Sequence, residues 1–242
     1  MNLVNYLGER IAYNKQRSHR IETLADGVFA ITMTLLVLDI RTPVKELNTE
    51  SDIWLSLVST LPRILTFVLT FSVAGQFWSI FTTQFNYIHT SDRNENIIAL
   101  FYLMFVSILP FSASFLSRNL WSRVAVGFYV LNLLCILSFH SFHWLYSFYS
   151  GLVKVEGKEG IAIHREIMRR AKIAFLAYAI VVACCFFSSY LALSSTILVH
   201  VILTFGGFIE LLHSKRSKKS TAQTQSPNDG PVPENRAEVR KS

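Results

Sequence analysis

Apolar runs about twenty residues long recur along this chain from Ile21 to Leu212. An α-helix needs a run of that length to cross the hydrocarbon core of a bilayer. Because the bilayer offers the backbone no hydrogen-bonding water, a spanning segment must be a helix or part of a closed barrel. Hydrophobic residues make up 51% of the chain, which leaves little polar surface for a soluble fold. The sequence therefore predicts an all-α, polytopic membrane protein.

Six transmembrane helices are expected, with boundaries at the ends of the apolar runs. Pro62 is expected to stop a short interfacial helix over 53–61, whereas Pro110 lies inside a span, where membrane helices tolerate proline. A Ser-rich turn separates the last two spans, and 42–52 forms the loop after the first. The expected spans are 21–40, 63–81, 97–116, 124–148, 173–190 and 191–212.

Lys and Arg are concentrated in the connecting segments on one side of this layout, the side that holds both termini. Cytoplasmic loops carry such an excess, so a multi-pass plasma-membrane protein with both termini in the cytoplasm is expected. The layout gives a cytoplasmic N-terminus over 1–19, a six-helix transmembrane domain over 20–213 and a disordered basic tail over 214–242. The tail is a solubilising segment or one that rests on anionic lipid.

The net charge of +7 does not indicate nucleic-acid binding, because its cations lie in patches between apolar runs. Membrane lipids are the expected surroundings. Cys135, Cys184 and Cys185 lie inside apolar runs and are expected to be small buried hydrophobes. His140 and His143 are one helical turn apart in the fourth span, with no carboxylate or third His nearby in sequence. Packing or interhelical hydrogen bonding is favoured for them over a metal or proton site, and no metal, cofactor or enzymatic activity is expected.

The first span carries ionisable residues, Arg20, Glu22, Asp26 and Asp39, at its ends and inside it. Such groups are costly in a membrane and are functional candidates by default. This combination indicates a transport pathway.

One face of the first span is a stripe of apolar residues with a single hydroxyl. Ile31, Thr34, Leu35 and Leu38 follow the spacing i, i+3, i+4, i+7, whereas Asp26 falls well off that face. By periodicity alone, the stripe is more simply a packing surface than the wall of a pore.

The segment RIETLADGVFAI, over 20–31, closely resembles the signature R-x-x-x-F-S-D of the transmembrane protein 175 family of potassium channels. Arg20 and Asp26 match that signature. Leu24 and Ala25 stand where the family usually has Phe and Ser.

Two further segments carry the resemblance. LTFVLTFSVAGQFW, over 65–78, is similar to the family's second helix, and Leu109-Pro110-Phe111 is similar to its third. Phe81 stands where the family usually has His. The resemblance covers the first half of the chain by motif and the rest only by span count and length.

The resemblance implies a potassium-selective channel built as a homotetramer, with four first helices around a central pore. Counted from the motif Asp, it implies a hydrophobic constriction at Ile31, further apolar rings at Leu35 and Leu38, and a selectivity layer at Thr34. These are the four residues of the stripe. The chain has no TVGYG-like segment for a carbonyl filter, so potassium, the permeant ion, must meet side chains.

Asp26 is expected to accept a hydrogen bond from a neighbouring helix rather than to attract cations. Arg20 belongs to the structural motif. On an ideal helix it projects to the same side as the stripe, where four Arg would repel cations; the alternative is that it turns toward a cytoplasmic loop or a lipid phosphate. Asp39 either concentrates cations at the outer mouth or is an interfacial acid.

Two other functional classes remain at this point. A secondary transporter would use Asp26 as a proton- or cation-coupled carboxylate, but paired repeats and broken helices are not evident. An intramembrane enzyme or a noncatalytic assembly factor is the other.

Overall fold

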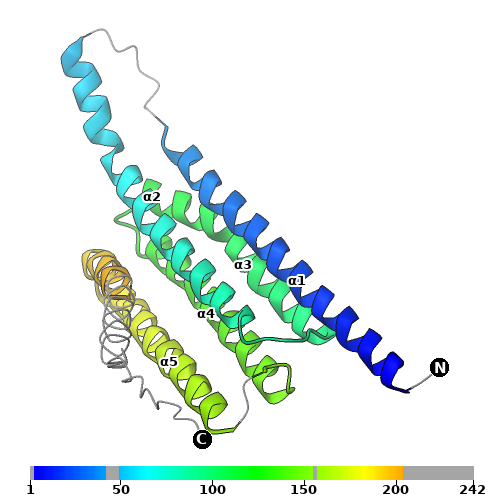
Figure 1. The fold of residues 1–242 in the computed structure, drawn as a ribbon. Helices are drawn as coiled ribbons and strands as arrows, with labels where there is room; N and C mark the ends of the chain where they lie inside the picture. Colours follow the sequence, from blue (N-terminus) through cyan, green and yellow to red (C-terminus); the bar gives the residue numbers. More distant parts are fainter. Residues whose placement is uncertain (1–2, 42–48, 155–156, 204–242) are drawn as a thin grey trace, which may run out of the picture. The chain divides into compact units, whose positions relative to one another are not determined.

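The computed structural model describes residues 3–41, 49–154 and 157–203. These residues are helical apart from short connections and one β-bridge, between Ile88 and Val153. Among them, five helices are long and apolar enough to cross a membrane, and a shorter apolar helix follows at Ser189–Leu203. The expected all-α membrane architecture is thus confirmed (Figure 1). The elements are α1 (Leu3–Leu36), η1 (Val37–Asp39), α2 (Glu50–Phe85), α3 (Arg93–Arg118), α4 (Arg123–Tyr149) and α5 (Gly157–Phe187).

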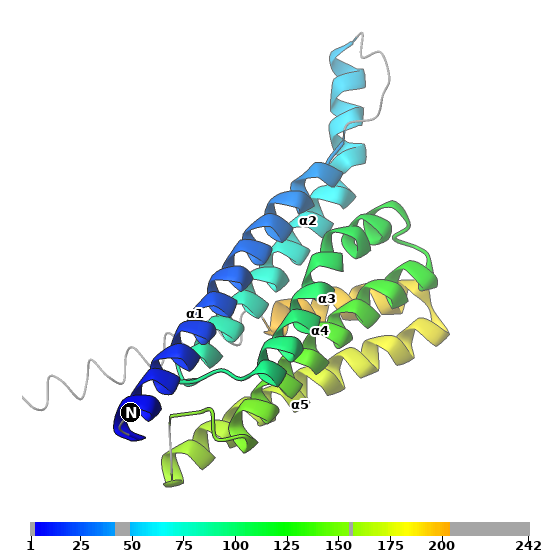
Figure 2. The ribbon, with the colours of Figure 1, turned by 90° about the vertical axis from the view of Figure 1, so that its right-hand side faces the viewer.

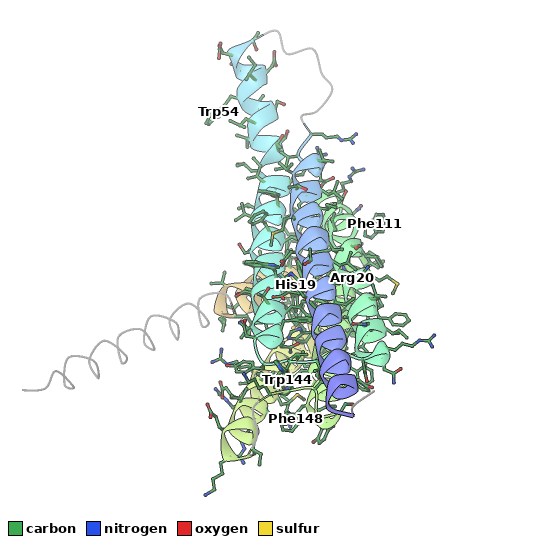
Figure 3. All side chains as sticks on the ribbon, turned by 45° about the vertical axis from the view of Figure 1, so that its right-hand side comes forward. His19, Arg20, Trp54, Phe111, Trp144 and Phe148 are labelled. Carbon is green, nitrogen blue, oxygen red and sulfur yellow. The ribbon has the colours of Figure 1, made fainter. Side chains whose placement is uncertain are left out.

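α2 runs without interruption through Pro62, so the expectation of a separate helix over 53–61 is wrong. The helix starts at a capping box, in which the Thr49 hydroxyl and the Asp52 carboxylate each accept a backbone N–H at 3.2 Å. Pro62 removes only one backbone donor, and a kink in the helix relieves the clash of its ring with the preceding turn. Accordingly, the N-terminal part of α2 runs in a different direction from the rest (Figure 2). Trp54 lies on that part, 65% exposed, and points away from the other helices (Figure 3).

The boundary between the last two helices is a single non-helical residue, Ser188, within the predicted Ser-rich region. Its hydroxyl accepts the Tyr190 N–H at 3.3 Å, which starts the next helix. α5 begins at Gly157 rather than 173, because the basic amphipathic stretch before the apolar run is helical as well. The predicted tail over 214–242, positions 42–48 of the first loop and positions 204–212 of the last span lie outside the described residues.

α3 is the central helix of the described part, with contacts to α1, α2 and α4. Its buried face includes Tyr102, Val106 and Leu109, each at most 1% exposed. α1 packs on α2 and α3. One face of α1 is therefore used inside the chain, and the other is left open.

The α2–α3 connection and the α4–α5 connection lie side by side. The His89 N–H donates to the Leu152 carbonyl, and the Lys154 N–H donates to the Tyr87 carbonyl, both at 2.9 Å. These bonds fix the ends of α2 and α4 and the start of α3 at one end of the helices, the end predicted to be cytoplasmic.

Candidate functional site

α1 has two faces that differ sharply in burial. Ala25, Phe29, Thr32 and Leu36 follow the spacing i, i+4, i+7, i+11 and are 1–3% exposed. This buried face holds α1 against α2 and α3. The opposite face is the candidate site.

The open face of α1, continued by η1, carries the four residues of the predicted stripe, of which Leu38 lies on η1. Ile31 and Leu38 are each 60% exposed, and Leu35 is 44% exposed. Thr34 lies among them and is exposed as well. Apolar side chains at this exposure are typical of a surface that meets lipid or another protein chain.

The Thr34 hydroxyl is oriented by the helix backbone. Its Oγ1 donates to the carbonyls of Ala30 and Ile31, at 3.0 and 2.9 Å. The hydroxyl hydrogen is thereby used inside the helix, and the oxygen's lone pairs remain available to a hydrogen-bond donor or a cation. The exposed face thus presents one set of oxygen ligands between apolar rungs.

Asp26 is held by a neighbouring helix. The indole Nε1 of Trp78, on α2, donates to its Oδ1 at 2.8 Å. The bond joins α1 to α2 beside the stripe rather than on it. Arg20 lies six residues earlier on α1 and is exposed (Figure 3).

Asp39 is bound to α3 instead of standing free at a mouth. Its carboxylate accepts hydrogen bonds from Ser114 at 2.6 Å and Ser117 at 2.5 Å, and pairs with Arg118 at 3.1 Å. Its side chain is only 15% exposed. The sequence could not place these α3 partners beside it, because they are more than seventy residues away along the chain. Asp39 fixes the far end of α1.

His140 and His143 take part in interhelical hydrogen bonds, as favoured from sequence, but their surroundings were missed. The carboxylate lacking nearby in sequence is Glu95 of α3, and Gln84 of α2 lies between the two rings. The only available signal was an acidic residue next to the start of a span. Within the described residues, no group of three or more His, Cys, Asp or Glu side chains is placed to hold a metal ion.

Comparison with known proteins gives consistent matches. The family described as "Endosomal/lysosomal potassium channel TMEM175" matches residues 20–110. A potassium channel of Streptomyces collinus is 33% identical over 132 residues, which are 52% of this chain and 63% of that protein. The chain thus spans less than two thirds of this relative. A potassium channel of a Chryseobacterium species is 26% identical over 204 residues, 83% of this chain and 96% of that protein.

The fold agrees with these matches. The crystal structure of a lysosomal potassium-selective channel TMEM175 homolog from Chamaesiphon minutus superposes with a TM-score of 0.68 at 25% identity. The match covers 78% of this chain and 97% of that one. Residues 20–110 hold the α1 stripe, the Asp26–Trp78 bond and most of α3. By sequence match over residues 20–110 and by fold, this chain is similar to the TMEM175 potassium channels.

Proposed function

We propose that this chain is a potassium-selective cation channel whose pore is lined by the open face of α1 from four copies. The observation that carries the proposal is the exposure of Ile31, Thr34, Leu35 and Leu38 on one face, opposite the face buried against α2 and α3. Four such faces around an axis would bury the stripe and leave a narrow path along it. The names of the similar proteins support potassium as the permeant ion.

The apolar rungs form the gate in this proposal. Four Ile31 side chains meeting on the axis exclude water, and Leu35 and Leu38 extend the dry segment. An ion entering it loses hydration without gaining a ligand, so the closed state is the default. Separation or rotation of the α1 helices widens the path and admits hydrated ions.

Thr34 supplies selectivity. Its hydroxyl hydrogen is engaged by the backbone, at 2.9 Å from the Ile31 carbonyl, so its lone pairs are free to replace water around a cation. Potassium gives up its water more cheaply than sodium, and a ring of weak hydroxyl ligands favours it modestly.

Asp26 braces the pore helix rather than coupling transport to protons. Its hydrogen bond to Trp78 argues against the alternative of a transporter that uses this carboxylate. The excess of Lys and Arg on the side that holds both termini supports a location in the plasma membrane with both termini in the cytoplasm.

Reconstitution tests the proposal directly. The purified full chain is expected to be tetrameric by native mass spectrometry and to carry potassium into liposomes under a potassium gradient without valinomycin. Bilayer recordings are expected to give a reversal potential that favours potassium over sodium. A monomer whose uptake requires a proton gradient would exclude the channel and favour the transporter.

A further inference from the structure

A fully buried acid–base pair joins α3 to α4 outside the proposed pore. Nε2 of His143 lies 2.6 Å from Oε1 of Glu95, and both side chains are 0% exposed. The other carboxylate oxygen, Oε2, accepts the Ser91 hydroxyl at 2.5 Å. Trp144, the next residue, marks this end of α4 in Figure 3. The pair therefore lies near the predicted cytoplasmic end of the helices.

Gln84 of α2 completes the cluster. Its Oε1 faces Nδ1 of His143 at 3.3 Å, and its Nε2 donates toward Nε2 of His140 at 3.0 Å. Both ring nitrogens of His143 thus face oxygen acceptors, which suits an imidazolium that donates from each nitrogen. The arrangement is a hydrogen-bonded acid–base pair with a neutral amide as its third partner, contributed by three helices.

The His143 ring packs on a row of aromatic side chains that extends to α1. The ring centroid of Phe81 is 5.3 Å from that of His143 and 4.6 Å from that of Tyr102, on which it stacks. Tyr102 in turn lies 6.1 Å from Phe29. Phe29 belongs to the buried face of α1, two residues before Ile31. Contacts therefore run continuously from the acid–base pair to the pore-lining helix.

A buried ion pair constrains the distance between the two helices that carry it. Removing one charge leaves the other buried without compensation, so the pair tolerates little change in the distance between α3 and α4. The aromatic rings that connect this pair to α1 pass on the fixed distance between α3 and α4, because packed interiors deform little.

We propose that the Glu95–His143 pair positions α1, by holding Phe81 and Tyr102 against Phe29, and so sets how readily the pore opens. This inference rests on the proposed channel function for its consequence, but not for its structural part. His143 and Glu95 are positioning residues, since neither faces the ion path. Their effect is on opening and not on selectivity.

The variant Glu95→Gln isolates the charge. Its amide oxygen still accepts from His143, and its amide nitrogen still reaches Ser91, so shape and hydrogen bonding are kept. We expect a severalfold larger leak current at an unchanged reversal potential. We also expect severalfold faster hydrogen–deuterium exchange of the amides in 27–36 of α1, with exchange in 104–116 of α3 unchanged. His143→Gln is expected to change leak and α1 exchange in the same direction, and the double variant, which leaves no uncompensated buried charge, to change them less than either single variant.

Ser112→Ala is the matched control. It removes a buried hydrogen bond between the same two helices, from Asn132 Nδ2 to Ser112 Oγ at 3.1 Å, about 25 Å along α3 from Glu95. It should leave both α1 exchange and leak unchanged. Wild-type α1 exchange in Glu95→Gln and His143→Gln, or equal acceleration in all helices, would overturn the positioning role. Absence of potassium current from the wild-type protein would instead refute the proposed function, while the exchange experiment would still decide the positioning.

Discussion

The indole of Trp78 donates a 2.8 Å hydrogen bond to the carboxylate of Asp26, across the contact between α2 and α1. Phe81, one turn further along α2, belongs to the aromatic chain that reaches Phe29 of α1. α2 thus holds α1 directly through the hydrogen bond to Asp26, and indirectly through Phe81, which stacks on Tyr102 of α3. The Tyr102–Phe29 contact lies on the buried face of α1, away from the open stripe.

Trp78→Phe tests the first of these contacts. It removes the donor but keeps most of the ring, and a hydrogen bond to a charged group contributes about 1.5–3 kcal/mol. We expect thermal unfolding at a clearly lower temperature, and a similar decrease for Asp26→Leu. The double variant should lose little more than either single variant.

Trp54→Phe is the control for this pair, because Trp54 is 65% exposed and remote from α1. It should leave the unfolding temperature within error of the wild type. Additive losses in the Trp78 and Asp26 variants would mean that the bond does not form in the membrane.

Ile31→Asn tests the hydrophobic gate. A polar amide at the constriction hydrates the path and offers the ion ligands, so the closed state should leak. The expected result is a basal potassium flux into liposomes severalfold above the wild type. Leu131→Asn on α4 places the same change on another exposed apolar position, 57% exposed, and should leave the flux unchanged. Equal flux in all three proteins would remove Ile31 from the pore.

The sequence predicted the parts of this molecule that depend on local periodicity. Apolar runs of membrane length gave the helices, and the 3.6-residue period placed Ile31, Thr34 and Leu35 on one face. Both signals are contained within a single helix. The structure adds that the opposite face, not this one, is used by the chain's own packing.

Contacts between distant segments were beyond sequence reasoning. Glu95 and His143 are 48 residues apart, and Ser114 is 75 residues from Asp39. Nothing local indicates such partners, because they depend on which helices are neighbours and on their relative rotation. The predicted helix end at Pro62 was wrong for a different reason. Proline tends to end an isolated helix, whereas a helix packed in a membrane accommodates proline by bending.

Thr34→Ala tests the selectivity layer. It removes the only side-chain oxygen among the four stripe residues, so the preference for potassium over sodium should fall while current persists. Thr34→Ser keeps the hydroxyl and its bond to the backbone, and should retain most of the preference. Reversal potentials under bi-ionic conditions measure the difference.

Thr83→Ala serves as the control for Thr34. Its hydroxyl makes the same kind of backbone bond, to the Ser79 carbonyl at 2.7 Å, but it lies exposed on α2. It should leave the reversal potential unchanged. A wild-type reversal potential in Thr34→Ala would place selectivity elsewhere.

Asp39→Asn distinguishes a structural brace from a cation-concentrating mouth. A free carboxylate at a mouth raises the local cation concentration, most strongly at low ionic strength. Asp39 is instead engaged by Ser114, Ser117 and Arg118. We therefore expect Asp39→Asn to lower the unfolding temperature, through loss of about 1.5–3 kcal/mol. Its unitary conductance at low potassium should equal that of the wild type. Arg118→Met should also lower the unfolding temperature, because it removes the other charge of the pair. A fall in the conductance of Asp39→Asn confined to low salt would show that the Asp39 carboxylate faces the ion path.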